Sequence, residues 1–194
     1  MERIVVIGSS CAGKTTFARR LARRIGVPHV ELDALYWLPG WEGRPREAFR
    51  ALVAEATAGE RWIVDGNYSK ARDVVWPRAT TAIWLDFAFP RVMARALLRT
   101  TRRVVRREVV HGGNRETFRN AFLHWDGIPL WVLRTFRRRR REYPALLSSA
   151  AYAHLHVVVL RRPAEAEQFL AQIEAEAGEG AHPTLLAGSP LPPP

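Results

Sequence analysis

The sequence predicts an α/β fold in which a parallel five-stranded sheet is covered by helices on both faces. Short, continuously apolar segments alternate along the chain with longer segments in which apolar residues recur every three or four positions. Continuous apolar strands are typical of parallel sheets that are buried on both faces. The alternation of strands and helices favours the same topology, because each crossover places a helix over the sheet. At 194 residues, the chain fits one domain with inserted lobes.

The predicted strands and helices follow one another in regular order. We expect strands at residues 3–7, 29–32, 61–64, 81–85 and 154–160. We expect helices at residues 14–25, 46–58, 90–103, 130–141 and 164–177. The first helix has apolar residues on one face and arginines on the other, and Gly26 follows it as a typical helix end. Pro90 stands at a favoured first-turn position of the third helix.

The composition excludes several classes of protein. Cys11 is the only cysteine, so the chain can form neither an intramolecular disulfide nor a zinc site built from several cysteines. No apolar run reaches the ~18 residues of a membrane-spanning helix, and we expect no membrane partner. The first apolar stretch is short and ends at Gly8, which indicates a strand rather than an export signal and predicts a cytoplasmic location.

A phosphate-binding motif, the P-loop, occupies residues 8–15. Their sequence, Gly-Ser-Ser-Cys-Ala-Gly-Lys-Thr, matches G-x-x-x-x-G-K-[ST], and it follows an apolar strand and opens an amphipathic helix. The glycines permit torsions that a side chain would forbid, so backbone N–H groups can surround an anion. The motif predicts that Lys14 bridges the terminal phosphates of ATP and that the Thr15 hydroxyl binds Mg²⁺. The residues expected to contact the nucleotide are Gly8, Ser9, Ser10, Cys11, Ala12, Gly13, Lys14, Thr15 and Thr16.

With this motif, the expected fold becomes the three-layer sandwich of P-loop NTPases with a helical lid insertion. The alternative is a glycine-rich turn in which Lys14 faces solvent, but it leaves unexplained why one of only two lysines stands at this position. Cys11 lies near a helix N-terminus, where a thiol pKa can be lowered. The alternative is that Cys11 simply fits the loop.

Three predicted strands are followed by aspartates, at the edge of the sheet where α/β proteins bind ligands. Asp65 follows a hydrophobic run, as in a Walker B strand, and is the candidate Mg²⁺ ligand beside Thr15; the alternative is a turn-forming Asp-Gly pair. Asp33 is a candidate for binding the acceptor or activating its hydroxyl, or else a helix cap or loop residue. We expect Asp86 to be structural.

We expect residues 1–176 to form one kinase-like domain and the glycine- and proline-rich residues 177–194 to form a disordered tail. Within the domain, residues 34–58 are the predicted acceptor-side segment, and residues 104–128 are the predicted lid. Three aromatic residues of the acceptor-side segment either stack on a planar acceptor or pack over the sheet edge: Tyr36, Trp37 and Trp41. His111 and His124 have no metal-ligand spacing and are expected on the lid surface.

Arginine accounts for 28 of the 30 basic residues, and fifteen arginines lie between residues 91 and 141 against three acidic residues. Such a segment favours an anionic partner, such as phosphate groups, nucleic acid or another polyanion. Phosphoryl transfer needs only a few arginines. The surplus therefore indicates either polyanion binding or a solvated, arginine-rich surface.

Residues 1–176 resemble adenylate kinase and its relatives in the P-loop, in Asp65-Gly66 after a strand, and in the spacing of Asp86, Arg95 and Arg99. The sequences at 32–37, 39–41 and 62–68 further resemble bacterial proteins labelled topology-modulation or adenylate-kinase-like proteins. The resemblance implies that Arg95 and Arg99 grip the transferring phosphoryl group. It also implies further arginines on the helix that returns from the lid, where the candidates are Arg134, Arg137 and Arg138. Adenylate kinase has Asp-Gly-Phe-Pro-Arg where this chain has Asp-Gly-Asn-Tyr-Ser at 65–69, so an AMP-gripping arginine is missing.

The sequence thus supports three hypotheses. The first is an ATP- and Mg²⁺-dependent kinase of a small molecule or nucleotide, in which Lys14, Arg95 and Arg99 stabilise the phosphoryl group and Asp33 serves the acceptor. The second is a nucleic-acid-associated P-loop ATPase of the DNA topology modulation type. The third is a regulator that binds nucleotide without turnover.

Overall fold

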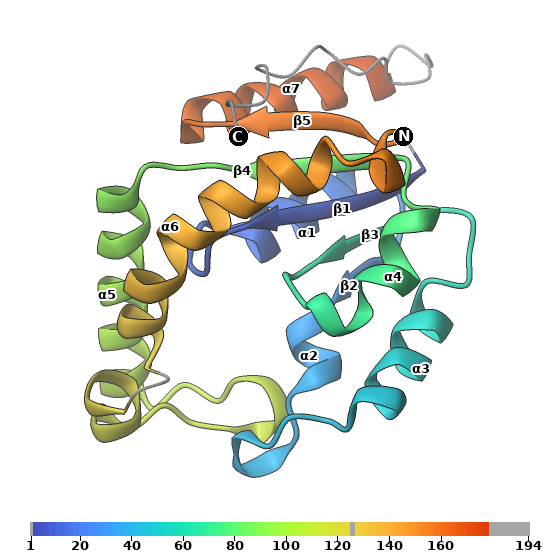
Figure 1. The fold of residues 1–194 in the computed structure, drawn as a ribbon. Helices are drawn as coiled ribbons and strands as arrows, with labels where there is room; N and C mark the ends of the chain where they lie inside the picture. The colour runs from blue at the N-terminus through green and yellow to red at the C-terminus, as the bar shows by residue number, and fades with distance from the viewer. Residues whose placement is uncertain (1, 125–126, 179–194) are drawn as a thin grey trace.

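A computed structural model describes residues 2–124 and 127–178 and confirms the predicted α/β fold (Figure 1). The five strands are all parallel and lie in the order β2-β3-β1-β4-β5. Their bounds are Arg3–Gly8 (β1), His29–Glu31 (β2), Trp62–Asp65 (β3), Thr81–Leu85 (β4) and His156–Leu160 (β5). β1 therefore lies at the centre of the sheet, and its carboxyl end opens directly into the P-loop.

Seven helices complete the described part of the chain. Their bounds are Lys14–Ile25 (α1), Leu32–Tyr36 (α2), Arg46–Ala56 (α3), Arg72–Val75 (α4), Phe89–Arg106 (α5), Ile128–Leu147 (α6) and Pro163–Gly178 (α7). The short helices α2 and α4 were not predicted, because four or five residues carry too little periodicity. α6 runs beyond its predicted end because Tyr143 and Leu147 are buried against the sheet. The predicted tail lies outside the described residues from residue 179 onward.

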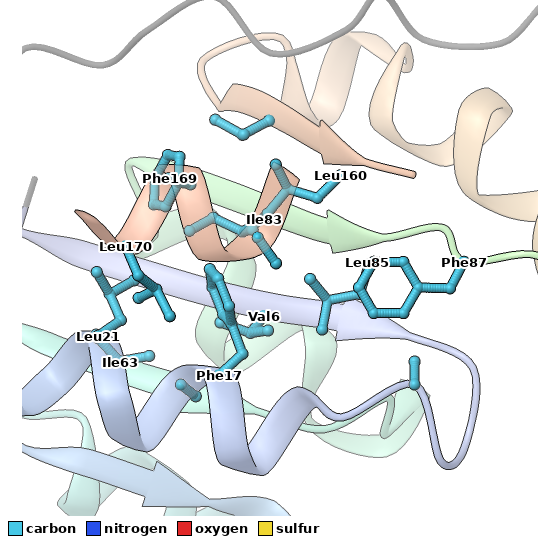
Figure 2. Packing of buried hydrophobic residues seen from close by; sticks show 14 of the residues in the cluster. Val6, Phe17, Leu21, Ile63, Ile83, Leu85, Phe87, Leu160, Phe169 and Leu170 are labelled. Carbon is cyan, nitrogen blue, oxygen red and sulfur yellow. The ribbon is translucent and has the colours of Figure 1, made fainter. Parts of the chain in front are cut away.

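Helices cover both faces of the sheet, because alternate strand residues point to opposite faces. On one face, Val6 and Ile83 meet Phe17 and Leu21 of α1 and Leu170 of α7 (Figure 2). On the other, Val5 and Trp84 meet residues of α3, α4 and the end of α6. No helix of the described residues is long and apolar enough to cross a membrane.

The segment between α5 and α6 reaches across the carboxyl edge of the sheet to the segment that follows α2 (Figure 1). Only part of it is helical: a 3₁₀ turn at His111–Gly113 and a π turn at Arg119–Leu123. Asn114 is 5% exposed and ties the two segments together. Its amide group donates to the Leu38 carbonyl at 2.8 Å, and its oxygen accepts from the Trp41 N–H at 3.0 Å. The predicted lid and acceptor-side segments are therefore in contact in this structure.

Candidate active site

The P-loop needs glycine at its first position. Gly8 has φ = 147°, and a Cβ there would lie 2.7 Å from the Leu85 carbonyl oxygen of β4. Gly13 has φ = 99°, and a Cβ there would lie 3.1 Å from a guanidinium nitrogen of Arg95. The loop thus fits closely between the strand beside it and α5, and it opens α1 at Lys14. Ser9 is buried within the loop, whereas Thr16 is exposed in the first helical turn.

Lys14 folds back over the loop, where its ammonium group donates to the Ser9 carbonyl at 3.1 Å. Burial lowers the pKa of Lys14, and the positive charge of Arg139 acts in the same direction, while Asp33 and Asp65 oppose it. A phosphate beside Lys14 would favour its charged form. The environment of this lysine therefore suits an anionic ligand.

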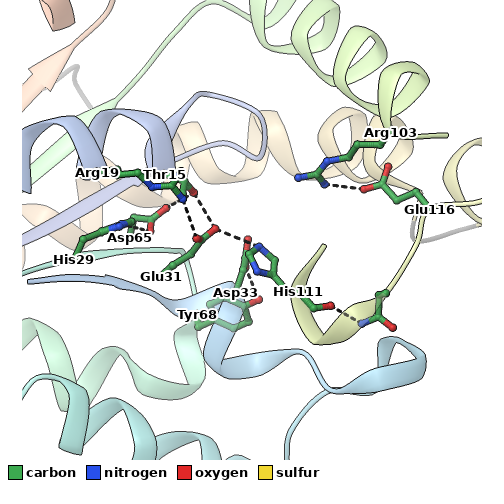
Figure 3. A network of polar contacts seen from close by, with 11 residues as sticks. Thr15, Arg19, His29, Glu31, Asp33, Asp65, Tyr68, Arg103, His111 and Glu116 are labelled. Atoms are coloured by element: carbon green, nitrogen blue, oxygen red, sulfur yellow. Dashed lines mark hydrogen bonds and ion pairs between the residues drawn. The ribbon is translucent and has the colours of Figure 1, made fainter. Parts of the chain in front are cut away.

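Two predicted Mg²⁺ ligands meet at the start of α1. The Thr15 hydroxyl donates to Asp65 Oδ2 at 2.6 Å, and Asp65 is 3% exposed (Figure 3). His29 Nε2 lies 2.9 Å from Asp65 Oδ1, and Glu31 Oε1 lies 3.3 Å from the Thr15 hydroxyl. Hydroxyl and carboxylate oxygens are the protein donors that Mg²⁺ prefers, so this donor set fits the ion. Sequence reasoning missed Glu31, although Glu31 is the last residue of β2 and precedes Asp33 by two residues.

Asp33 lies on the acceptor side of this cluster. The Tyr68 hydroxyl donates to Asp33 Oδ1 at 2.6 Å, and burial together with the charge of Asp33 raises the pKa of Tyr68. Tyr68 will therefore stay protonated and hold the Asp33 carboxylate in one orientation.

The aromatic residues of the acceptor-side segment pack against one another. Tyr36 lies 4.7 Å from Tyr68 and 5.2 Å from Phe49 between ring centroids. Trp37 lies between Tyr36, at 5.0 Å, and Trp41, at 5.6 Å. These rings form an apolar wall beside Asp33 and extend the core of the α3 face.

Arginines from α5 and α6 converge on the P-loop. Arg95 donates to the Ala12 carbonyl at 2.9 Å. Burial raises the pKa of the Cys11 thiol, and the nearby positive charge of Arg99 opposes this rise. The Arg139 guanidinium lies 3.4 Å from the Ser10 hydroxyl and packs over the Trp131 ring at 5.9 Å.

The run of arginines on α6 divides between the loop and the surface. Arg139 comes to the P-loop, whereas the candidates Arg137 and Arg138 are exposed, and Arg138 pairs with Glu142 at 3.6 Å. Arg140 lies 3.2 Å from Asp86, which is 5% exposed. Burial raises the pKa of Asp86 more than Arg140 lowers it. The pairing with Arg140 agrees with the expected structural role of Asp86, which stays a prediction.

Of the two interpretations of Cys11, the lowered thiol pKa is contradicted, and the simple fit to the loop is favoured. Burial raises the pKa of the Cys11 thiol, and this effect outweighs the opposing charges of Arg99 and Lys14. The thiol is enclosed by the loop and the two arginine-bearing helices, so removal from water decides the sign. Cys11 therefore fits the loop as a small apolar residue.

We expect Cys11 to react slowly with thiol reagents in the native protein. Near pH 7.5 its alkylation by iodoacetamide should be at least about tenfold slower than in the urea-denatured chain, because only the thiolate reacts. The native rate should keep rising above the ordinary thiol pKa, where the rate for the denatured chain levels off, because the pKa of the native thiol is raised. Since the chain has one cysteine, mass spectrometry measures this site alone, and a native rate equal to the denatured rate would contradict the assignment.

Asn67 links the end of β3 to the first residue of the P-loop. Its side-chain oxygen accepts from the Gly8 N–H at 3.3 Å, and its amide group donates to the Gly8 carbonyl. The side chain thus bonds both backbone groups of Gly8, where β1 passes into the loop. No local pattern in the sequence indicates this role, because the two residues are far apart along the chain.

Replacement of Asn67 by alanine should loosen the loop. Loss of both hydrogen bonds is expected to lower the free energy of unfolding by about 1–3 kcal/mol. Each 1.4 kcal/mol of this loss that is needed to order the loop for the nucleotide should weaken Mg·ATP binding about tenfold. Denaturant unfolding and calorimetry measure the two effects. Ser69→Ala is a nearby control at an exposed position, and equal nucleotide affinities for the two variants would refute the role of Asn67.

No protein-family model matches the chain, and a search of the curated proteins finds no match. Several solved kinases share its fold. Shikimate kinase from Bacteroides thetaiotaomicron is similar over 91% of this chain and 98% of that one, with a TM-score of 0.53 and 13% identity. Shikimate kinase from Acinetobacter baumannii, solved in complex with shikimate, is similar over 93% and 94%, with a TM-score of 0.52 and 16% identity.

A gluconokinase from Sinorhizobium meliloti is also similar in structure, over 93% of this chain and 98% of that one, with a TM-score of 0.48 and 18% identity. At these identities the similarity to the two shikimate kinases concerns the fold alone. The chain therefore has the fold of the P-loop kinases.

Proposed function

We propose that the protein is a kinase that transfers the γ-phosphoryl group of ATP, with Mg²⁺, to a hydroxyl group of a small molecule. One observation carries this proposal: the P-loop lies directly beside Asp65, which ends β3, and beside the carboxylates at and just after the end of β2. Thr15 contacts Asp65 at 2.6 Å, and Asp33, held by Tyr68, lies on the acceptor side of the same cluster. Nucleotide-binding and proton-accepting groups thus share one edge of the sheet, where α/β proteins bind ligands.

Each group of residues in the site would have a separate role. Backbone N–H groups of residues 8–15 and the start of α1 would bind the phosphates, and Lys14, Arg95 and Arg99 would stabilise the charge of the transferring group. Arg139 joins them in this proposal because it reaches the loop. Thr15 and Asp65 would hold Mg²⁺, which supplies positive charge to the phosphate oxygens when bound. Asp33 would accept the proton of the acceptor hydroxyl.

The aromatic wall and the lid would enclose the acceptor. The contact between residues 107–116 and the segment after α2 supports this role, since closing an active site excludes water from phosphoryl transfer. Ser69 stands where adenylate kinase has an AMP-gripping arginine, which favours a small hydroxylated acceptor over AMP. Within this proposal, the chain belongs with the adenylate-kinase-like proteins that include the topology-modulation group, as its motifs at 32–41 and 62–68 suggest.

An ADP-release screen tests the proposal. Purified protein with Mg·ATP would be offered hydroxy acids, sugars, nucleosides, nucleoside monophosphates and nucleic acid in parallel. Release that depends on one small hydroxylated compound, with the phosphorylated product detected by mass spectrometry, would support the kinase. Release stimulated only by DNA or RNA, and falling steeply with salt, would replace it with the ATPase. Nucleotide binding without release in any arm would indicate a regulator.

A further inference from the structure

Three metal-ligating side chains converge from separate segments of the chain. Glu31 ends β2, Asp33 lies in the first turn of α2, and His111 lies in the turn between α5 and α6. One ligand atom from each lies within 4.8 Å of the others, and among the described residues they form the one such group. His111 Nε2 lies 3.2 Å from Glu31 Oε1 (Figure 3). Sequence spacing could not reveal this group, because His111 is distant from the two carboxylates along the chain.

The spacing of these atoms suits a first-row transition metal. Nitrogen and oxygen donors lie about 2.0–2.2 Å from such an ion, so two donors of one ion are about 3–4 Å apart. The 3.2 Å between His111 Nε2 and Glu31 Oε1 lies in this range, and the 4.8 Å within which all three donor atoms lie is slightly wider. An imidazole beside two carboxylates favours Zn²⁺, Co²⁺ or Mn²⁺ over Mg²⁺, which prefers an all-oxygen set.

Neighbouring groups hold each ligand in place. Tyr68 donates to the Asp33 carboxylate at 2.6 Å. Asn114 donates to the His111 carbonyl at 2.8 Å and to the Leu38 carbonyl, which fixes the turn that carries the imidazole. The side chains of Glu31 and His111 are 18% and 26% exposed, so the group is partly withdrawn from water. Such outer hydrogen bonds are typical of metal sites, where they orient the ligands.

We propose that Glu31, Asp33 and His111 form a second divalent-metal site, which takes a transition metal such as Zn²⁺ or Co²⁺ and lies beside the Thr15–Asp65 position expected for Mg²⁺. Glu31 lies between the two positions, since the same oxygen faces the Thr15 hydroxyl and the His111 ring. Because two ligands come from the sheet edge and the third from the turn between α5 and α6, a bound ion bridges these two parts. The proposal concerns metal binding alone and does not depend on phosphoryl transfer.

Titration of the nucleotide-free, full-length protein with Co²⁺ tests the site. Bound Co²⁺ is followed by its visible absorption, and we expect saturable binding of one ion per chain. His111→Ala should raise the dissociation constant for Co²⁺ at least about tenfold, because one of three protein ligands is lost. His154→Ala is the matched control, since His154 is exposed and contacts the Trp76 carbonyl instead. Glu31→Gln should weaken binding as His111→Ala does.

A second measurement follows the metal in the wild-type protein and uses a variant only to assign the signal. In the ¹⁵N-labelled wild-type protein, Zn²⁺ should shift the ring-nitrogen resonances of one histidine, and that signal should be the one missing from the spectrum of His111→Ala. The proposal is overturned if Co²⁺ binds equally well to the two histidine variants, if binding does not saturate, or if Zn²⁺ shifts no histidine or a different one. Thermal unfolding without metal shows whether each variant is folded.

Discussion

Lys14→Ala is expected to lower kcat/KM for acceptor phosphorylation by about 10²–10³-fold, the loss found when one preorganised donor to a developing charge is removed. Lys14 belongs to the loop itself, and its ammonium group contacts the Ser9 carbonyl. The arginines of α5 and α6 approach the loop from outside and cannot occupy the same place. The measurement is coupled-assay kinetics with the acceptor that the ADP-release screen identifies.

The matched control for Lys14→Ala is Arg23→Ala, which removes a cation from the exposed side of the same helix. The control should keep full activity. Thermal unfolding should show that both variants are folded, because Lys14 donates one hydrogen bond and is not part of either apolar core. Activity of Lys14→Ala within about threefold of the wild type, well short of the tenfold that 1.4 kcal/mol represents, would refute the proposed phosphate contact.

Asp33→Asn is expected to lower kcat by about 10²–10⁴-fold, the usual range for loss of a general base. The amide is similar in size and can still accept from the Tyr68 hydroxyl, so the orientation of the side chain should persist. It cannot take a proton from the acceptor. The affinity for Mg·ATP should remain close to that of the wild type, because the proposed nucleotide contacts lie in the P-loop.

Two controls separate a chemical role of Asp33 from a structural one. Asp73 is an exposed carboxylate on α4 that pairs with Arg50 of α3 at 2.6 Å. Asp73→Asn should leave kcat unchanged. Tyr68→Phe removes the hydrogen bond to Asp33 but keeps the carboxylate, so its effect on kcat should be smaller than that of Asp33→Asn. If Tyr68→Phe abolished kcat while Asp33→Asn lowered it only slightly, the proton transfer would belong to a different group.

The fold was predictable because its signals are local. β1, β3, β4 and β5 each contain a continuous apolar run, whereas the short β2 is only His-Val-Glu. Each long helix shows an apolar stripe that ends at a glycine or begins at a proline. The P-loop was predictable for a similar reason, since its eight residues are consecutive and each fixed position has its own steric or electrostatic requirement. The meeting of Thr15 with Asp65 also followed, because parallel strands end at one edge of the sheet.

The missed contacts depend on tertiary structure. Asn67 reaches Gly8, and Arg139 reaches Ser10, across distances along the chain that no periodicity describes. For α6 the difficulty was register: five consecutive arginines surround the helix, and only its rotation against α5 decides which one faces the loop. His111 showed no metal-ligand spacing because Glu31 and Asp33, on β2 and α2, are far from it along the chain.

The bonds of Asn114 have a consequence for how a substrate would enter. They join the turn at residues 107–116 to the backbone at Leu38 and Trp41. A molecule bound beneath this bridge must arrive while the bridge is broken, so the observed dissociation constant equals the intrinsic constant divided by the fraction of molecules that are open. The Asn114 amide would thereby set how much of the intrinsic affinity a ligand realises, although the amide does not contact the ligand.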